Sequence, residues 1–358
     1  MGQVLNDENS LTADPSNPDL AYAVWDRLRD FTLPPGNPSA SDMVKATAGA
    51  GDGVVAARQR AKQLADLAKA GRQPTQVFFK GPAFFSRTTD GGDSWEPIKK
   101  IHDPGPNAQT INNIVAVPPS GTVFDFFTEI SPNAGTRIGF VRSFDKGATF
   151  NGARYATTIA TVFGSITPDT QELVRDASIL FDVAVDPRNG NLYLVWQDVR
   201  FSAVDEVAFS MSTNGGLSWS NPVRINKTPR NHANILRQQA ILPTIAVAAG
   251  GKLVATYYDY RFDTDNGQES LDDWAIICDS SKLDCRDPAN WGVELRLTEH
   301  SFDILKAPQA GGFFLGDYMG LVAARANVLP AFGIVDGDQR TSVFTRKIKL
   351  GGQVTAAE

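Results

Sequence analysis

The sequence predicts an all-β fold built from repeated small antiparallel sheets, and two observations lead to that prediction. The first is an eight-position signature, Ser/Thr-x-Asp/Asn-x-Gly-x-Ser/Thr-aromatic, which begins at Thr88, Ser143 and Ser212. Copies about 55 to 70 residues apart indicate an array of repeated supersecondary units. The second is a series of apolar, β-branched and aromatic runs of strand length, which recur in pairs broken by turn residues.

Each signature is typical of a tight hairpin turn. An Asp or Asn side chain accepts hydrogen bonds from backbone amides two residues on, and Gly supplies the positive φ that a compact turn needs. The hydroxyl groups bond back to the loop, and we expect the closing aromatic ring to be buried beneath the turn. The alternative is that the Asp side chains bind calcium or a substrate. A structural role is predicted for Asp90, Trp95, Asp145, Phe150, Asn214 and Trp219.

The strand pairs define five units, near residues 10–27, 111–130, 178–198, 240–259 and 313–336. In the third unit an apolar first strand at 179–185, expected to line a central channel, is followed by a second strand ending at 196–200. A third strand at 207–212, the signature turn and a fourth strand at 222–226 complete a four-stranded meander, the blade of a β-propeller. We therefore expect one propeller domain over residues 1–358, closed by pairing of residues 3–6 with the last blade.

One segment breaks the strand pattern. Residues 54–70 are rich in strong helix formers, with an apolar face through Ala57, Ala61, Leu64 and Ala68. We predict a helical insertion at 31–74, between the second and third strands of the first blade.

Composition argues against several kinds of partner. The formal net charge is −6 and no basic run is present to neutralise phosphates, so we expect no nucleic-acid partner. No apolar stretch is long enough to cross a bilayer, so no membrane span is expected. The three histidines are scattered and no Cys-x-x-Cys spacing occurs, so we expect no zinc site, no other metal and no cofactor. A monomer is expected.

The only two cysteines, Cys278 and Cys285, flank the place where a worn fourth signature is expected, between Asp279 and Trp291. A disulfide there would replace the missing turn bonds and would suit an oxidising compartment, whereas two buried free thiols are the alternative. The polar residues after Met1 do not form a signal peptide. Cytosolic protein, mature form and truncated sequence all stay open, and we favour a secreted or periplasmic origin.

The signature resembles the Asp-box, or bacterial neuraminidase repeat, of sialidases, related glycosidases and several non-enzymatic propellers. Residues 182–200, 256–261 and 314–320 also resemble sialidase-like β-propeller proteins. The resemblance covers nearly the whole chain apart from about residues 35–73. It implies a sialidase-like propeller. Sialidases of this type have six blades. Five are counted in this sequence, and the resemblance makes six possible.

Strand direction predicts where a ligand would bind. Adjacent strands of a meander alternate in direction, so the signature turns emerge at one end of each sheet and the ends of the second strands at the other. At that other end the sequence repeats Asp and Arg: Trp25-Asp26-Arg27, Asp198-Val-Arg200, Asp259-Tyr-Arg261 and Asp338-Gln-Arg340. Substrate-binding roles are predicted for Arg27, Arg175, Arg200, Asp259, Arg261, Asp317 and Arg340, because guanidinium and carboxylate groups suit a charged or polyhydroxylated ligand. The alternative is that each Asp pairs with its Arg and only ties strands together.

The family resemblance implies an arginine triad that grips a substrate carboxylate, a Tyr nucleophile activated by Glu, and an Asp acid. The matching candidates are Arg200, Arg261 and Arg340 for the grip, Tyr318 or Tyr258 with Glu129 for the nucleophile, and Asp26 for the acid. The Arg-Ile-Pro motif of sialidases is absent, and Arg137-Ile-Gly139 does not replace it.

Two functions follow from these patterns. The first is a secreted sialidase-like glycoside hydrolase acting on an acidic or complex glycan. The second is a non-catalytic propeller that binds glycan or protein. A hydrolase predicts converging Arg, carboxylate and Tyr groups, with at least one carboxylate of raised pKa. A binding module predicts that every Asp is paired with its own Arg.

Overall fold

A computed structural model describes residues 4–32, 77–161, 164–351 and 353–356. The chain divides into two compact units, Met1–Ala160 and Thr161–Glu358. The secondary structure of the described residues is β-strand with four short 3-10 segments: η1 Ile235–Gln238, η2 Ala249–Gly251, η3 Pro288–Asn290 and η4 Ile304–Lys306. No helix among these residues is long and apolar enough to cross a membrane. The predicted helical insertion at 31–74 lies outside the described residues, apart from residues 31 and 32 at the end of a strand.

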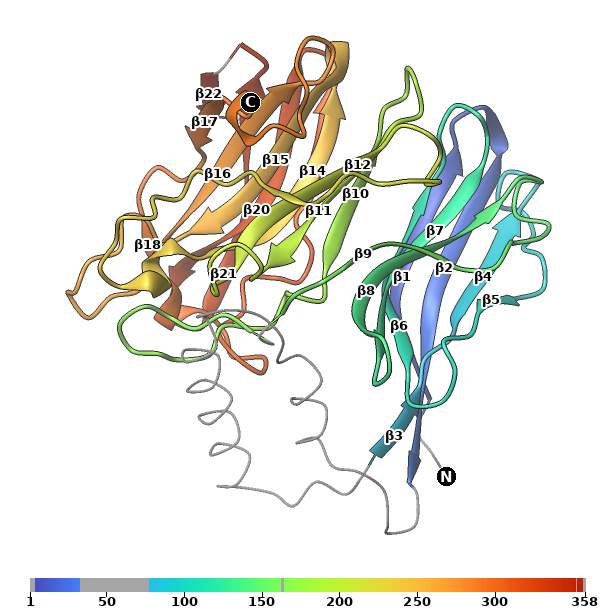
Figure 1. Cartoon of the computed structure of the whole chain (residues 1–358), viewed down its shortest axis with the longest axis horizontal. Coiled ribbons are helices and arrows are strands. Elements are labelled where there is room, and N and C mark those ends of the chain that lie inside the picture. Colours follow the sequence, from blue (N-terminus) through green and yellow to red (C-terminus); the bar gives the residue numbers. More distant parts are fainter. Residues whose placement is uncertain (1–3, 33–76, 162–163, 352, 357–358) are drawn as a thin grey trace. The chain divides into compact units, whose positions relative to one another are not determined.

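The first unit holds two sheets, drawn in blue, cyan and green in Figure 1. The first sheet has the order β1 Val4–Asp14, β2 Asn17–Thr32, β4 Ala83–Thr88 and β5 Lys99–His102, and the short β3 Val77–Lys80 also pairs with β2. The second sheet has the order β6 Gln109–Ala116, β7 Val123–Ser131, β8 Gly135–Ser143 and β9 Arg154–Thr158.

The second unit holds three sheets. The third sheet is β10 Phe181–Val185, β11 Leu192–Asp198, β12 Glu206–Ser212 and β13 Val223–Arg224. The fourth is β14 Ala240–Ala248, β15 Lys252–Asp259, β16 Ser270–Asp279 and β17 Val293–Arg296, with β18 Phe302–Asp303 on β16. The fifth is β19 Gly320–Ala324, β20 Asn327–Gly337, β21 Arg340–Lys349 and β22 Gln353–Ala356. Two large apolar clusters fill this unit, one around Tyr258 and Phe332 and the other around Tyr257 and Trp291.

The predicted fold class is confirmed. All five sheets contain a meander of four antiparallel strands, which is the blade of a β-propeller, and their number equals the number of units counted in the sequence. The expected pairing of residues 3–6 with the last sheet is wrong. Residues 4–6 belong to β1, which pairs with β2 from Val4 onward, and β22 supplies the fourth strand of the fifth sheet instead. Two consecutive glycines at 351 and 352 are the sequence signal for a turn before β22.

Burial follows position in the sheet. Every residue of β11 is buried, whereas the first strand β10 alternates between buried and half-buried residues. The second strand has neighbours along both edges, so water reaches it least. This explains why second strands read as continuous apolar runs.

The three signature turns share one hydrogen-bond pattern. In the copies at Thr88, Ser143 and Ser212 the hydroxyl donates to the Asp or Asn side chain at 2.7, 2.7 and 3.0 Å and accepts the Gly amide at 2.9, 2.7 and 2.9 Å. The same Asp or Asn oxygen then accepts the amide four residues on, at 3.0, 2.8 and 3.0 Å. A turn stabilised by its own side chains, as the sequence indicated, is the result.

The aromatic residues of the signatures behave less uniformly. Phe150 packs edge-on against Phe85 at 4.8 Å. Trp95 is 44% exposed, so its expected burial is wrong. It lines an open apolar groove with Leu11 and Trp25 of the same sheet rather than the space beneath its turn.

The worn fourth copy is closed by a disulfide between Cys278 and Cys285, as expected. Asp279 still accepts hydrogen bonds from the amide and hydroxyl of Ser281 at 3.2 and 2.6 Å. The indole of Trp291 is fully buried and donates to the carbonyl of Cys285 at 2.9 Å. The crosslink and a buried ring therefore do here what hydroxyl and amide bonds do in the other three turns.

We predict that Ser143→Ala lowers the free energy of unfolding by about 1–3 kcal/mol, because it leaves the buried Gly147 amide without its acceptor. Ser143→Thr is the matched control, since Thr88 makes the same contacts in the first copy. Urea unfolding of both variants measures the difference. Equal destabilisation by Ala and Thr would show that the hydroxyl contributes nothing.

Candidate functional site

The strand register separates the signature turns from the ends of the second strands. In the third sheet Ser212, where the signature begins, is opposite Leu192, whereas Asp198 at the other end of β11 is opposite Glu206. The first and second sheets have the same arrangement, with Thr88 opposite Ala21 and Ser143 opposite Val123. The opposite ends of the second strands carry Asp26, Glu129, Asp198 and Asp259.

In the first unit this end forms a polar seam between the first and second sheets. Asp26 is opposite Ala83, which is opposite His102, so the three residues share one face of the first sheet. On the second sheet Asp125, Phe127 and Glu129 alternate along β7 and therefore also share a face. The His102 ring stacks on Phe127 at 4.7 Å, which shows that these two faces meet.

Glu129 is the centre of this seam. Its carboxylate contacts His102 Nε2 at 2.8 Å, accepts Arg137 Nη2 at 2.6 Å and accepts the Tyr155 hydroxyl at 2.8 Å. The Arg137 guanidinium also lies 3.4 Å from the centre of the Tyr155 ring. Glu129 is 2% exposed and Tyr155 is 37% exposed, so the carboxylate is buried behind a phenol that solvent reaches.

The charges of this cluster are fixed by its hydrogen bonds. Burial alone would raise the pKa of Glu129, but the bonds from His102, Arg137 and Tyr155 outweigh it and lower that pKa to about 2. Burial and the bond to Glu129 raise the pKa of Tyr155 to about 12. At neutral pH the pair is thus a carboxylate and a neutral phenol, with the phenolic proton directed at the carboxylate.

Gly139 makes the position of Tyr155 possible. It is opposite both Phe127 on β7 and Tyr155 on β9. A Cβ atom at this position would lie 2.7 Å from the Phe127 ring and 3.0 Å from the Tyr155 ring. The missing side chain leaves the space into which both rings pack.

Asp26 and Asp125 form the second part of the seam. Asp125 is completely buried, and neither of its side-chain oxygens has a hydrogen-bond partner among the described residues. Burial, reinforced by the charge of Asp26, raises the pKa of Asp125 well above its ordinary value. A raised carboxyl pKa is what a hydrolase predicts, but burial also raises the pKa of Asp182, Asp259, Asp263 and Asp273, so the shift at Asp125 does not by itself mark an active site. Arg27 is directed away, donating to Asn6 at 2.7 Å and lying over the Phe84 ring.

In the second unit the predicted arginines are already engaged. Arg200 binds Asp198 through its amide, Nε and Nη2 at 2.9, 2.8 and 2.8 Å. Arg261 binds Asp259 and, through two further bonds at 2.6 and 2.7 Å, Glu294, and its side chain is 9% exposed. A guanidinium held by two carboxylates has little capacity left for a third, so the structure does not favour Arg261 as a carboxylate grip.

The Asp-x-Arg pattern is a local motif rather than a marker of this end. Asp186 and Arg188, in the hairpin between β10 and β11, make the same three bonds at 2.9, 3.0 and 2.7 Å, and so do Asp284 and Arg286 in the disulfide loop. Both of these pairs lie at the end of their sheets that the signature turns occupy. The alternative that each Asp pairs with its own Arg and ties strands together therefore accounts for Asp198 and Arg200.

Five other predicted residues have different settings. Arg340 pairs with Asp336 at 2.8 Å and not with Asp338, because β20 and β21 are joined by a tight turn that leaves Asp338 exposed. Arg175 binds Asp317 through two bonds of 3.0 Å, and the neighbouring Tyr318 is 58% exposed. Tyr258 is a core residue: its hydroxyl bonds both the amide and the carbonyl of Gly333 at 2.9 Å, and it is 1% exposed, so it is not an accessible nucleophile.

Sequence reasoning found Glu129 but missed Tyr155, Arg137 and His102. Arg137 follows Glu129 across a short hairpin, a signal that was available in the sequence. Tyr155 and His102 belong to the fourth strands of two different sheets, and only the register brings them to Glu129.

Comparison with known proteins gives likeness at the level of structure only. No family model matches the chain, and no curated protein is similar to it. A Hadza microbial sialidase has a TM-score of 0.46 at 14% identity, over 98% of this chain and 53% of that one. A leech intramolecular trans-sialidase has 0.46 at 11%, over 99% and 57%. An α-L-arabinofuranosidase of Fusarium graminearum has 0.44 at 13%, over 98% and 82%. The chain thus spans little more than half the length of these two sialidases, and at such values the likeness carries no conclusion about activity.

We predict that Glu129→Gln lowers the free energy of unfolding at pH 7 by up to about 3 kcal/mol. The pKa of Glu129 falls from 4.5 to about 2 on folding, so its stabilisation is complete above pH 4.5 and is lost as the pH falls toward 2. The gap between wild type and variant should therefore close over that range in urea unfolding at a series of pH values. A gap that does not vary with pH would contradict the assignment.

We also predict that Arg261→Ala lowers the free energy of unfolding by about 3–5 kcal/mol, because Asp259 and Glu294 lose their shared cation in a buried position. Arg286→Ala is the control, since that pair has the same local geometry but is exposed and should be close to neutral. Thermal unfolding compares them. If Arg261→Ala and Arg286→Ala destabilise the protein equally little, the ion pairs of Arg261 are weak and its guanidinium is available to bind a ligand.

Proposed function

We propose that the chain is a glycan-active β-propeller that acts as a glycoside hydrolase, with Tyr155 as nucleophile and Glu129 as its base. One observation carries the proposal: the hydroxyl of Tyr155, a residue that is 37% exposed, donates to the buried Glu129 carboxylate at 2.8 Å, and Arg137 and His102 fix that carboxylate. A nucleophile within hydrogen-bond reach of a base that a third group orients is the general arrangement for covalent catalysis.

The groups have separate roles in this proposal. Tyr155 attacks the anomeric carbon, and Glu129 takes the phenolic proton as that bond forms. Arg137 and His102 bond the carboxylate throughout, so Glu129 does not need to reorganise. The Tyr155 phenol, with its pKa of about 12, is a weak nucleophile until the proton moves, which keeps the site unreactive without substrate.

Asp26 remains the proposed acid for the leaving group. It shares a face of the first sheet with His102, about 10 Å away between Cα atoms, two strand spacings across the sheet. It also lies close enough to Asp125 for its charge to disfavour ionisation of that carboxyl. Two neighbouring buried carboxyls tend to hold one proton between them, and the raised pKa of Asp125 favours that residue as its holder. The proposal therefore requires this proton to pass to Asp26 before the leaving group departs.

A complex or acidic glycan is the proposed substrate class, and it follows from the sequence signatures together with this cluster. Among the predicted binding residues, Arg27 lies in the same unit as this cluster and is proposed to contact the glycan. Arg175, Arg200, Asp317 and Arg340 belong to the second unit, and their binding roles stay predictions. Export is proposed as well, supported by the Cys278–Cys285 disulfide, because such bonds persist in oxidising compartments. A monomer is proposed.

A non-catalytic glycan-binding propeller is the second candidate. It is favoured by the closed Asp–Arg pairs of the third and fourth sheets, in which Asp198 and Asp259 are fully buried beneath their own arginines. In that case the protein would recognise sugars through hydroxyl and aromatic groups, and Tyr155 would be a contact residue.

The deciding experiment is turnover of a panel of fluorogenic sialosides, arabinofuranosides and uronides. We expect Tyr155→Phe to lower kcat/KM on the active sugar by at least about 10³-fold, since the nucleophile is removed while the ring still packs. Tyr318→Phe is the matched control and should keep wild-type activity, because its exposed hydroxyl is outside this cluster.

A fluorinated glycoside of the active sugar should also trap the covalent intermediate. Peptide mapping is expected to find the label on Tyr155. Wild-type rates for Tyr155→Phe would exclude the proposed nucleophile. Glycan binding without turnover on any substrate would favour the second candidate.

A further inference from the structure

A second cluster of carboxylates lies in the second unit, at the loop end of the fourth sheet. Asp169, Asp263 and Glu269 each place an oxygen within 4.8 Å of the others. They come from two segments: Asp169 from the loop at 164–170, and Asp263 and Glu269 from the connection between β15 and β16. Asp263 and Glu269 are buried and Asp169 is half-buried, so water contributes little to their solvation.

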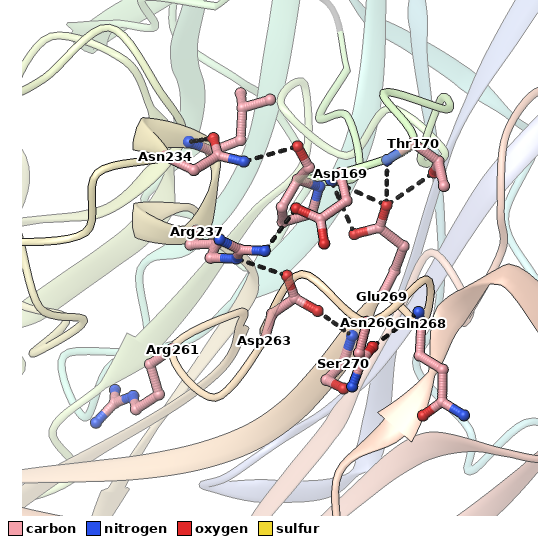
Figure 2. A network of polar contacts seen from close by, with 12 residues as sticks. Asp169, Thr170, Asn234, Arg237, Arg261, Asp263, Asn266, Gln268, Glu269 and Ser270 are labelled. Carbon is pink, nitrogen blue, oxygen red and sulfur yellow. Dashed lines mark hydrogen bonds and ion pairs between the residues drawn. The ribbon is translucent and has the colours of Figure 1, made fainter.

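Figure 2 shows how these carboxylates are held. Arg237 reaches both acidic loops, donating to Asp169 at 2.6 Å and to Asp263 at 2.8 Å. Glu269 accepts the amides of Asp169 and Thr170 at 3.0 and 2.5 Å. These hydrogen bonds hold the three carboxylates in one ordered network.

Two polar atoms in the cluster are left over. The second oxygen of Asp169 is buried without a hydrogen-bond partner among the described residues. The Tyr260 hydroxyl also has no hydrogen-bond partner among the described residues, and its side chain is fully buried. The charges that act on it most strongly are those of Glu269 and Asp263. A buried hydroxyl with no hydrogen-bond partner costs free energy, and a ligand that bonded the Tyr260 hydroxyl together with the second oxygen of Asp169 would remove that cost.

Charge leads to the same conclusion. Three carboxylates and one guanidinium leave a net charge of about −2, which a divalent cation would neutralise. The atoms available to ligate a metal are carboxylate, phenol and backbone oxygens, which suit hard cations and not zinc or copper.

We propose that Asp169, Asp263 and Glu269 bind a divalent cation, Ca²⁺ in preference to Mg²⁺, with the Tyr260 hydroxyl at its inner side. Oxygens on opposite sides of Ca²⁺ are about 4.6–5.2 Å apart, whereas those on Mg²⁺ are about 4.0–4.2 Å apart. Spacings of up to 4.8 Å therefore accommodate Ca²⁺ with little movement of the loops.

The cation would join two segments that lie outside the strands. It would fasten the 164–170 loop to the β15–β16 connection, which begins at Tyr260. The site would thus rigidify the end of the fourth sheet. It does not depend on the proposed hydrolase, because none of its residues belongs to the Glu129 cluster.

The test is Ca²⁺ binding to the whole chain after dialysis against EDTA, measured by calorimetry and by thermal unfolding. We expect one site, and a rise in Tm of about 5 °C or more at a hundredfold excess over Kd. Mg²⁺ should bind at least about tenfold more weakly. Absence of Ca²⁺ binding at millimolar concentration in the wild type would overturn the proposal, and so would equal affinity for the two ions.

Two variants locate the site. Asp169→Asn should weaken Ca²⁺ binding by at least about tenfold, and Asp284→Asn, an exposed acid of the same unit, should leave it unchanged. Tyr260→Phe separates a cation site from a purely structural network. It should stabilise the EDTA-treated protein, because an unpartnered buried hydroxyl is removed, and it should also weaken Ca²⁺ binding. Unchanged Ca²⁺ affinity in both Asp169→Asn and Tyr260→Phe would show that any bound ion lies elsewhere.

Discussion

Alternation of side chains along the central strands determines where chemistry is possible in this protein. On β7 the residues Asp125, Phe127 and Glu129 share one face, while Phe124 and Phe126 share the other and stack with Phe140 in an apolar cluster. A shift of the register by a single residue would place the carboxylates among the phenylalanines. The bulge in β6 between Ile111 and Ile114 lets that strand change phase without disturbing β7. The Glu129 cluster thus depends on a register that the aromatic face enforces.

Buried carboxylates are tolerated because nearly every one has a specific partner. Asp198, Asp259 and Asp272 are fully buried, and each binds the guanidinium of a nearby arginine. Such pairs add little stability relative to apolar residues, but breaking one leaves a buried charge. Their repetition along the chain therefore reflects how sheet ends are closed. It does not by itself mark a place where a ligand binds.

The fold was predictable from the sequence because its signals are local. The signature turns are set by residues within eight positions of one another, and the disulfide closes a loop between Cys278 and Cys285, so neither depends on distant contacts. The site was less predictable, since Glu129 meets its partners across two sheets and four strands. Asp198-Val-Arg200 was misleading for a related reason: the sequence shows the spacing of an acid and a base, but only the structure shows that they satisfy each other.

The ratio of carboxylates to guanidinium groups differs between parts of the chain. In the signature turns hydroxyls and amides bond the Asp side chain, and at most sheet ends one arginine pairs with one or two carboxylates. Among the described residues, Asp125 is buried with no hydrogen-bond partner, and Arg237 pairs with two carboxylates beside a third. An unsatisfied buried acid costs free energy that an apolar residue in its place would not, so these acids need an explanation other than the stability of the fold. The repeated Asp–Arg pairs need none, because each acid is balanced by its own guanidinium.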